Sequence, residues 1–198
     1  MPISKEILHG EQVFLLHNFL SPQECAAHIT RSEQSGYEEA TITTSRGAVM
    51  EKSIRDNSRL IVDDHALASE WLERAKAFLP TNFGGAKLRD FNERFRYYRY
   101  DIGQKFAMHY DGYYRRENGE QSQLTFMVYL NADFIGGDTR FYLDPRVPHL
   151  IVRPVAGAAL VFVHRQLHEG APVHEGRKYV LRTDVMYCVP TTTHQQRP

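Results

Sequence analysis

The chain has 198 residues, of which 42% are hydrophobic and 24% are charged. This length and composition are typical of one globular domain with a sizeable core. Lys and Arg together number 24, as do Asp and Glu, so the formal net charge is zero. A neutral chain has no general attraction to nucleic acid or to an anionic membrane.

The N-terminal stretch MPISKEILHGEQ has no apolar core of signal-peptide length, and no run of residues approaches the length of a membrane span. The two cysteines, Cys25 and Cys188, are too few for a disulfide framework. We therefore expect a cytoplasmic protein without a membrane segment. The sequence does not predict its oligomeric state.

The first part of the chain is expected to form a strand and a helix. Residues 12–19 have the composition of a strand. Ser21 is a good N-cap, Pro22 suits the first helical position, and Glu24 completes a capping box. These signals predict a helix that continues to about Ser35.

The polar stretch 44–58 is predicted to be a loop. Residues 65–80 have apolar side chains at helical spacing, and Pro80 marks the end of this second predicted helix. After residue 86, short segments rich in β-branched and aromatic residues alternate with turn residues. This pattern predicts a mainly β fold of the α+β class, a sandwich or barrel that the two helices cover on one side.

His109 and Asp111 are the first residues in the sequence that suggest a metal site. Residues i and i+2 of a strand point to the same face, so an imidazole and a carboxylate would converge on one point. A third ligand is required, for which His168 is the candidate and His164 and His174 are the alternatives. Two histidines and one carboxylate form the facial triad that leaves three positions open on Fe(II), whereas zinc is the alternative metal.

Three stretches of the sequence make it similar to a known family: YRYDIGQKFAMHYD, TFMVYLNADFIGGDTRF and RPVAGAALVFVHRQLHEGAPVHEGRKYVL. In this order, over about residues 94–188, they resemble the prolyl-4-hydroxylase-type branch of the 2-oxoglutarate- and Fe(II)-dependent dioxygenases. The resemblance implies one domain, with a double-stranded β-helix (jelly roll) as the catalytic core over 86–190 and a supporting region over 1–85. It also implies Fe(II), 2-oxoglutarate and O2, with ascorbate as a further candidate.

The resemblance also implies roles for individual residues. His109, Asp111 and His168 match the iron ligands of the family. Lys178, ten residues after His168, matches the basic residue that pairs with the distal carboxylate of 2-oxoglutarate. Three further residues match positions around the cosubstrate: Tyr100, Tyr129 and Thr139.

The segment 177–187 supports part of this assignment. Its odd positions are mostly apolar, whereas its even positions include Lys178, Arg182 and Asp184. If the strand is regular, its odd face packs, and cations buried on the other face need a counter-ion such as 2-oxoglutarate. The alternative is an ordinary solvated face. Arg182 lies roughly 13 Å along the strand from Lys178, so we expect it to pair with Asp184 instead.

Substrate contact is predicted for Arg94, Arg96 and Arg55, although salt bridges to neighbouring acidic residues are an equal alternative. Arg94 and Arg96 would share a strand face with Tyr100. The collagen- and hypoxia-type prolyl hydroxylases resemble each other in an arginine three residues before the threonine of the TxxxYLN strand, where this chain has Ser122. A prolyl substrate is therefore not implied by the sequence.

We expect a hydroxylase of unactivated C–H bonds. The first candidate substrate is a protein or peptide side chain, and the alternative is a free amino acid or another small molecule. The zero net charge argues against a nucleic-acid substrate. Residues 44–59 and 112–121 are candidates for a lid over the site. The alternative of another class is a jelly-roll module that binds a metal or an acidic ligand without turnover.

Overall fold

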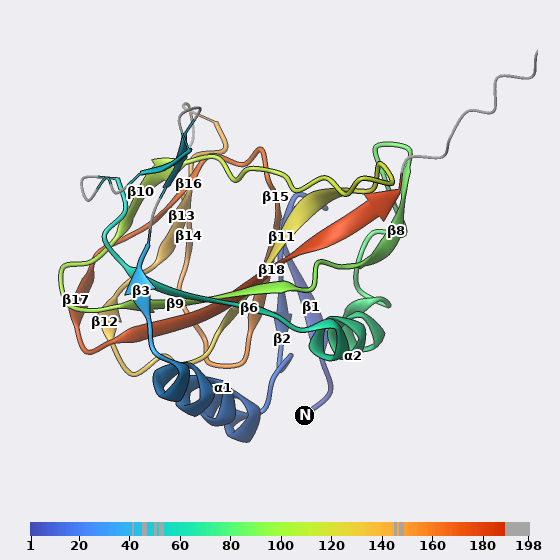
Figure 1. Cartoon of the computed structure of the whole chain (residues 1–198). Coiled ribbons are helices and arrows are strands. Elements are labelled where there is room, and N and C mark those ends of the chain that lie inside the picture. The colour runs from blue at the N-terminus through green and yellow to red at the C-terminus, as the bar shows by residue number, and fades with distance from the viewer. Residues whose placement is uncertain are drawn as a thin grey trace, which may run out of the picture.

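The computed structural model describes residues 1–40, 42–44, 47–49, 51, 54–144, 146 and 149–188. Two antiparallel sheets face each other, and both helices of the described residues, α1 (Pro22–Ser35) and α2 (His65–Ala75), pack on the far side of the larger sheet (Figure 1). Neither helix is long and apolar enough to cross a membrane. This arrangement is the predicted mainly β sandwich with helices on one side.

The large sheet has the strand order β1-β2-β15-β11-β18-β9-β6-β3, with β8 attached to β18 and β7 to β8. Its strands are β1 (Ser4–His9), β2 (Val13–His17), β3 (Glu38–Glu39), β6 (Ser58–Asp63), β7 (Asn82–Phe83), β8 (Ala86–Phe91), β9 (Arg94–Tyr100), β11 (Gln121–Tyr129), β15 (Ala159–Val163) and β18 (Lys178–Cys188).

The small sheet has the order β10-β16-β13-β14. Its strands are β10 (Phe106–His109), β13 (Thr139–Phe141), β14 (Leu150–Val152) and β16 (His168–Gly170). Two short pairs complete the strands of the described residues: β12 (Ile135–Gly136) with β17 (Val173–Glu175), and β4 (Ile42–Thr44) with β5 (Gly47–Val49).

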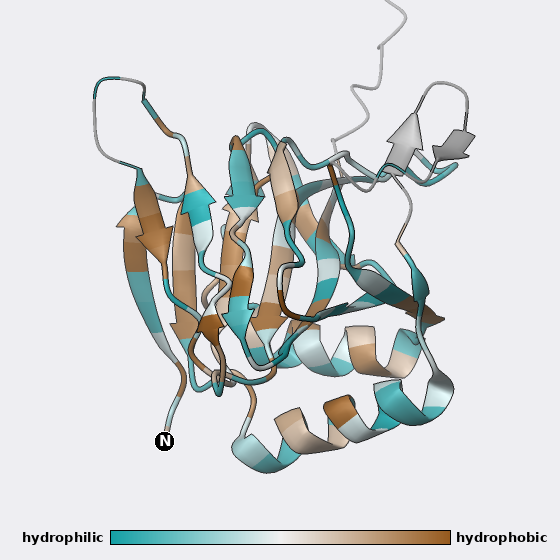
Figure 2. Cartoon of the chain, turned by 90° about the vertical axis from the view of Figure 1, so that its left-hand side faces the viewer, coloured by the Kyte–Doolittle hydropathy of each residue, from teal (hydrophilic) through white to brown (hydrophobic). Residues whose placement is uncertain are grey.

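β18 divides the core into two layers. Its odd side chains, among them Tyr179 and Leu181, join Trp71 of α2 in the core between the large sheet and the helices. On its even face, Lys178 and Val180 point between the two sheets. Successive strand residues point to opposite faces, and the alternation predicted for 177–187 is confirmed. Figure 2 shows that both hydrophobic and hydrophilic residues occur along the strands and the helices.

The first helix agrees with its predicted bounds. The Ser21 hydroxyl accepts a hydrogen bond from the backbone N–H of Glu24, and the Glu24 carboxylate accepts one from the backbone N–H of Ser21. The second predicted helix is wrong at its end, because α2 stops at Ala75 rather than near residue 80. The N–H of Phe78 bonds to the carbonyl of Ala75, which tightens the last turn and ends the helix.

The N-terminal region contributes more strands than the sequence predicted. β2 extends the large sheet beyond β15, and β6 pairs with β9, so residues of 1–85 are part of the core sheet itself. The predicted loop over 44–58 is wrong in part, because β4 and β5 form a hairpin there. Residues 45, 46, 50, 52 and 53 of that stretch lie outside the described residues.

Candidate active site

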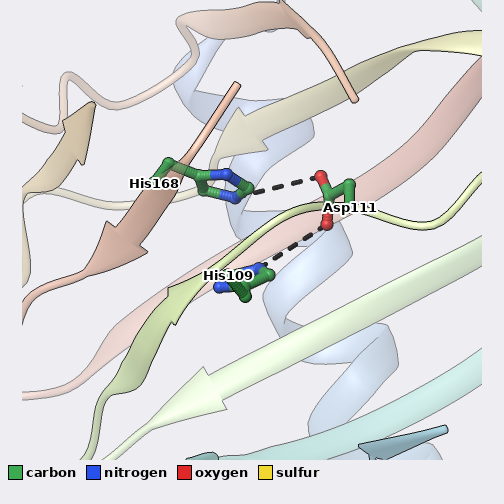
Figure 3. Close-up of side chains that lie close together, drawn as sticks. All are labelled: His109, Asp111 and His168. Carbon is green, nitrogen blue, oxygen red and sulfur yellow. Dashed lines mark ion pairs between the residues drawn. The ribbon is translucent and has the colours of Figure 1, made fainter. Parts of the chain in front are cut away.

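His109, Asp111 and His168 come together beside the space between the two sheets (Figure 3). Their candidate ligand atoms all lie within 4.8 Å of one another. Asp111 Oδ1 is 3.6 Å from His109 Nε2, and Asp111 Oδ2 is 3.9 Å from His168 Nε2. His109 ends β10, His168 begins β16, and the two are cross-strand partners. Strand pairing therefore supplies the proximity that spacing along the sequence does not show.

Backbone carbonyls fix the orientation of both imidazoles. His109 Nδ1 donates to the carbonyl of Ala107 at 2.7 Å, and His168 Nδ1 donates to that of Gln166 at 2.9 Å. A carbonyl only accepts, so each Nδ1 carries the proton and each Nε2 has a free lone pair. Burial also lowers the pKa of His168 to about 4, which keeps this imidazole in the neutral form that binds metals.

This donor set fits Fe(II). Two imidazole nitrogens and one carboxylate oxygen are the ligands of the facial triad, which leaves positions open for O2 and a bidentate cosubstrate. The two alternative histidines lie outside the cluster. His164 is hydrogen-bonded to Ser122 and Thr125, and His174 is exposed.

Asp111 is held by two donors. The hydroxyl of Thr125 donates to Oδ2 at 2.6 Å, and Arg182 Nη1 is 2.9 Å from Oδ1. Burial alone would raise the pKa of Asp111, but the guanidinium group of Arg182 outweighs it and holds this pKa well below its usual range. Asp111 is therefore an ionised and oriented carboxylate.

A chain of hydrogen bonds continues behind Thr125. Because the Thr125 hydroxyl donates to Asp111, it accepts from His164 Nδ1 at 3.0 Å. His164 Nε2 then accepts from the Ser122 hydroxyl at 2.9 Å. Ser122 thus belongs to a buried network that fixes the position of Asp111.

Arg182 has a larger role than the sequence indicated. It pairs with Asp184 at 3.2 Å, as predicted, but it also contacts Asp111 and Thr125. The predicted pairing with Asp184 is therefore only part of its role. The available signal was that Arg182 and Lys178 share a strand face.

Lys178 is almost fully buried, with 3% of the residue exposed. Its Nζ donates to the carbonyl of Gly137 at 2.6 Å and lies 5.3 and 5.5 Å from the ring centres of Tyr100 and Tyr129. Burial lowers its pKa to about 8. No carboxylate of the described residues forms an ion pair with Lys178, and a buried cation without a counter-ion favours an anionic ligand.

The residues predicted to surround the cosubstrate do meet in one place. Lys178, Tyr100 and Thr139 line the same pocket as the three candidate metal ligands. Tyr129 lies behind Thr139, and their hydroxyl oxygens are 2.7 Å apart. The geometry fits the predicted roles of all four, which remain proposals.

Gly137 provides the carbonyl that accepts the hydrogen bond from Lys178. Its φ of +66° is a conformation that L side chains rarely adopt, and an added Cβ would lie 2.9 Å from the Phe134 ring and 3.1 Å from Lys178 Cδ. Glycine thus brings a backbone carbonyl within hydrogen-bonding distance of the buried ammonium group.

A surface groove leads to the candidate metal centre. Its volume is about 580 Å³. Tyr98, Phe106, His109 and Asp111 line both this groove and the inner pocket, which is the pocket that contains Lys178 and the candidate metal ligands. We call it the arginine groove, after the four arginines that line it: Arg55, Arg59, Arg96 and Arg182. Two of the three arginines predicted to contact substrate are in this set. The third, Arg94, is bound to Asp63 at 2.9 and 3.1 Å and is not among the lining residues.

Comparisons with known proteins identify relatives of this chain. The family model of the 2OG-Fe(II) oxygenase superfamily matches residues 95–183. "Prolyl 4-hydroxylase 13" of Arabidopsis thaliana is 28% identical over 194 residues, which cover 85% of this chain and 69% of that protein.

Solved structures share the fold at lower identity. A prolyl-4-hydroxylase of Pseudomonas putida has a TM-score of 0.64 and 21% identity over 88% of this chain and 91% of that one. A prolyl hydroxylase of Trichoplax adhaerens, in complex with a peptide fragment of the hypoxia inducible factor oxygen degradation domain, has a TM-score of 0.70 and 18% identity over 89% of this chain and 84% of that one. These structures support the jelly-roll fold.

The fold and the site define a jelly-roll oxygenase with a facial-triad metal centre. The family model and the relatives support the assignment of this chain to the 2OG-Fe(II) oxygenase superfamily, in the prolyl-4-hydroxylase-like branch. It is a dioxygenase that uses Fe(II), 2-oxoglutarate and O2 to hydroxylate an unactivated C–H bond. The alternative of a binding module without turnover is therefore set aside.

Proposed function

We propose that this enzyme hydroxylates a side chain of a protein or peptide, with proline as the first candidate residue. The observation that carries the proposal is the arginine groove, which is open at the surface and reaches the candidate metal ligands. Two tyrosines that line it, Tyr110 and Tyr113, are 62% and 65% exposed. An accessible aromatic wall suits a polypeptide better than a small molecule that must be enclosed. The names of the relatives also support a prolyl substrate.

The residues of the chain have separate tasks in this reaction. His109, Asp111 and His168 would hold Fe(II), and Lys178 would pair with the distal carboxylate of 2-oxoglutarate. When bound, the iron supplies the oxidative decarboxylation of 2-oxoglutarate to succinate and CO2 that is coupled to hydroxylation.

Aromatic rings and an aliphatic side chain line the pocket around these groups. The ring of Phe106 stacks on His109 with 3.5 Å between ring centres, and Phe162 packs against His168 with 4.6 Å between ring centres. Val180 lines the same space. A dry pocket strengthens the attraction between Lys178 and the cosubstrate and suppresses side reactions.

Two measurements test the proposal. The iron-loaded enzyme should form succinate slowly from 2-oxoglutarate alone, and His168→Ala should abolish this activity. Peptides that contain proline should then gain one oxygen in mass spectrometry, whereas free proline and other free amino acids should not. Oxidation of free amino acids in preference to peptides would contradict the peptide substrate and favour the small-molecule alternative.

A further inference from the structure

Three guanidinium groups concentrate positive charge at the floor of the arginine groove. Arg55 lies over the Tyr98 ring, with 4.3 Å from Cζ to the ring centre, and over the Phe106 ring at 4.4 Å. Burial opposes ionisation of the Tyr98 hydroxyl, yet Arg55, Arg182 and Arg96 outweigh it and hold the pKa of Tyr98 below its usual value. The three arginines thus act together on one point beside the metal centre.

The protein neutralises only part of this charge. Arg96 and Arg182 share one carboxylate, Asp184, with distances of 3.2 Å to each. Arg182 also contacts Asp111, but a bound iron ion would take up the charge of that carboxylate. Among the described residues, these three arginines face one remaining carboxylate, which leaves an excess of two positive charges. The fourth arginine, Arg59, adds nothing to this excess because the carboxylate of its cross-strand partner Glu38 offsets its charge.

Arg55 is the arginine with the clearest need for a ligand. It is 6% exposed, and its Nε donates to the neutral amide oxygen of Asn57 at 2.7 Å. Its Nη2 is buried and has no hydrogen-bond acceptor among the described residues. A buried charged donor left unpaired is costly, so an anionic acceptor in the groove would be strongly favoured.

The charge of the cosubstrate is balanced within the inner site. Fe(II) with Asp111 leaves one positive charge, 2-oxoglutarate brings two negative charges, and Lys178 returns the inner site to neutrality. The excess in the groove therefore remains after metal and cosubstrate have bound, and the substrate is the remaining source of an anion.

We propose that the arginine groove binds an acidic peptide segment, with an Asp or Glu next to the hydroxylated residue. This inference rests on the proposed function and specifies its substrate. Arg182 Nη1 is only 2.9 Å from Asp111, so a carboxylate bound beside this guanidinium group lies close to the carbon that faces the metal. Tyr110 and Tyr113 would contact the flanking residues. The neutral net charge of the chain favours a peptide over a nucleic acid.

The test compares two pools of decapeptides with a central proline and randomised flanks. The pools differ only in that every Asp and Glu of one is Asn or Gln in the other. Binding is measured with the metal-loaded enzyme and 2-oxoglutarate under nitrogen, so that turnover is not required. We expect the acidic pool to bind about ten- to a hundred-fold more tightly, the range expected for one charged hydrogen bond.

Two variants locate the effect. Arg55→Gln should reduce the preference for the acidic pool to less than about threefold, while the affinity for 2-oxoglutarate stays unchanged and shows that the variant is folded. Arg94→Gln is the matched control, because Arg94 is paired with Asp63 outside the groove. It should keep the full preference. If Arg55→Gln does not fold, the comparison of the two pools on the unaltered enzyme still decides.

The inference is overturned if both pools bind equally, if a single-stranded oligonucleotide binds better than the acidic pool, or if free glutamate competes as well as a peptide. Its failure is distinguishable from failure of the proposed function. Selective binding of acidic peptides that are never oxidised would support the groove assignment and contradict the function. Oxidation of peptides without any acidic preference would do the opposite.

Discussion

Asp111 is the one anionic side chain in the candidate metal cluster, and it is held by Thr125 and Arg182. Asp111→Asn should therefore lower the affinity for Mn(II) or Fe(II) by at least about ten- to a hundred-fold, since even changes around a metal ligand commonly have this effect. Titration of Mn(II) followed by electron paramagnetic resonance measures it. His174→Ala, at an exposed histidine outside the cluster, is the control and should bind normally. Normal metal binding by Asp111→Asn would contradict the assignment.

Lys178 predicts a pH dependence of cosubstrate affinity. Burial lowers its pKa to about 8 in the free protein, and a bound dianion would raise this pKa. Below pH 8 the ammonium group is already charged, so it adds no pH dependence. Above pH 8 the protein must take up a proton to bind, so the Kd for 2-oxoglutarate should rise by up to about tenfold per pH unit.

Calorimetric titration of 2-oxoglutarate into the metal-loaded protein between pH 7 and 9.5 would measure this dependence. Lys178→Arg is the matched variant, because a guanidinium group stays charged throughout this range. Its Kd should be flat where that of the unaltered protein rises. A parallel rise in both proteins would assign the pH dependence to another group.

At the scale of elements, the first turn of α1 is stabilised by a capping box that is visible in the sequence. Ser21→Ala removes the hydroxyl that caps the helix, which should lower the free energy of unfolding by about 1 kcal/mol. Urea unfolding measures this loss. Ser69→Ala is the control within α2, where the hydroxyl bonds to the carbonyl of His65 four residues earlier. It should have little effect or stabilise slightly, because alanine has the higher helix propensity.

Signals contained in a few neighbouring residues predicted their elements well. The capping box of α1 and the alternation along β18 depend only on local chemistry, and both were read correctly. β6 was missed because its sequence, SRLIVD, does not alternate between polar and apolar residues, and the strand is defined by its pairing with β9. The end of α2 was misplaced because Pro80 marks where a helix can no longer continue, not where tertiary packing ends it.

The residues of the site also differ in whether neighbouring sequence was enough to predict them. The pair His109 and Asp111 could be predicted because both lie within three residues. The choice of His168 and the place of Lys178 needed the family resemblance, since only the pairing of β10 with β16 brings the histidines together. The contact of Arg182 with Asp111 joins β18 to the segment after β10 across the sandwich, and no spacing along the chain predicts it.

At the scale of the whole molecule, the site joins the two sheets. Side chains of β9, β11 and β18 in the large sheet and of β10, β13 and β16 in the small sheet line one pocket. A ligand bound there contacts both layers, and unfolding of either layer would release it. Binding of metal and 2-oxoglutarate should therefore stabilise the entire fold rather than one segment.

This coupling gives a thermal prediction. With saturating Mn(II), 2-oxoglutarate at a hundred times its Kd should add about 2.7 kcal/mol to the free energy of unfolding. For a chain of this size, that corresponds to a rise in Tm of about 5–11 °C, measured by calorimetry. In Lys178→Ala, a Kd raised about a hundred-fold leaves the same concentration near the new Kd. The gain should then fall to about 0.4 kcal/mol, or less than about 2 °C.

The variant Arg182→Gln distinguishes the role of Arg182 from that of Lys178, the other cation on the same face of β18. Arg182 contacts Asp111 and Asp184, whereas Lys178 lies beside Tyr100 and the carbonyl of Gly137. Arg182→Gln should therefore weaken Mn(II) binding and lower the starting Tm. Once metal is saturating, it should keep most of the rise that 2-oxoglutarate produces. If Arg182→Gln loses this rise and Lys178→Ala keeps it, then Arg182 binds the distal carboxylate.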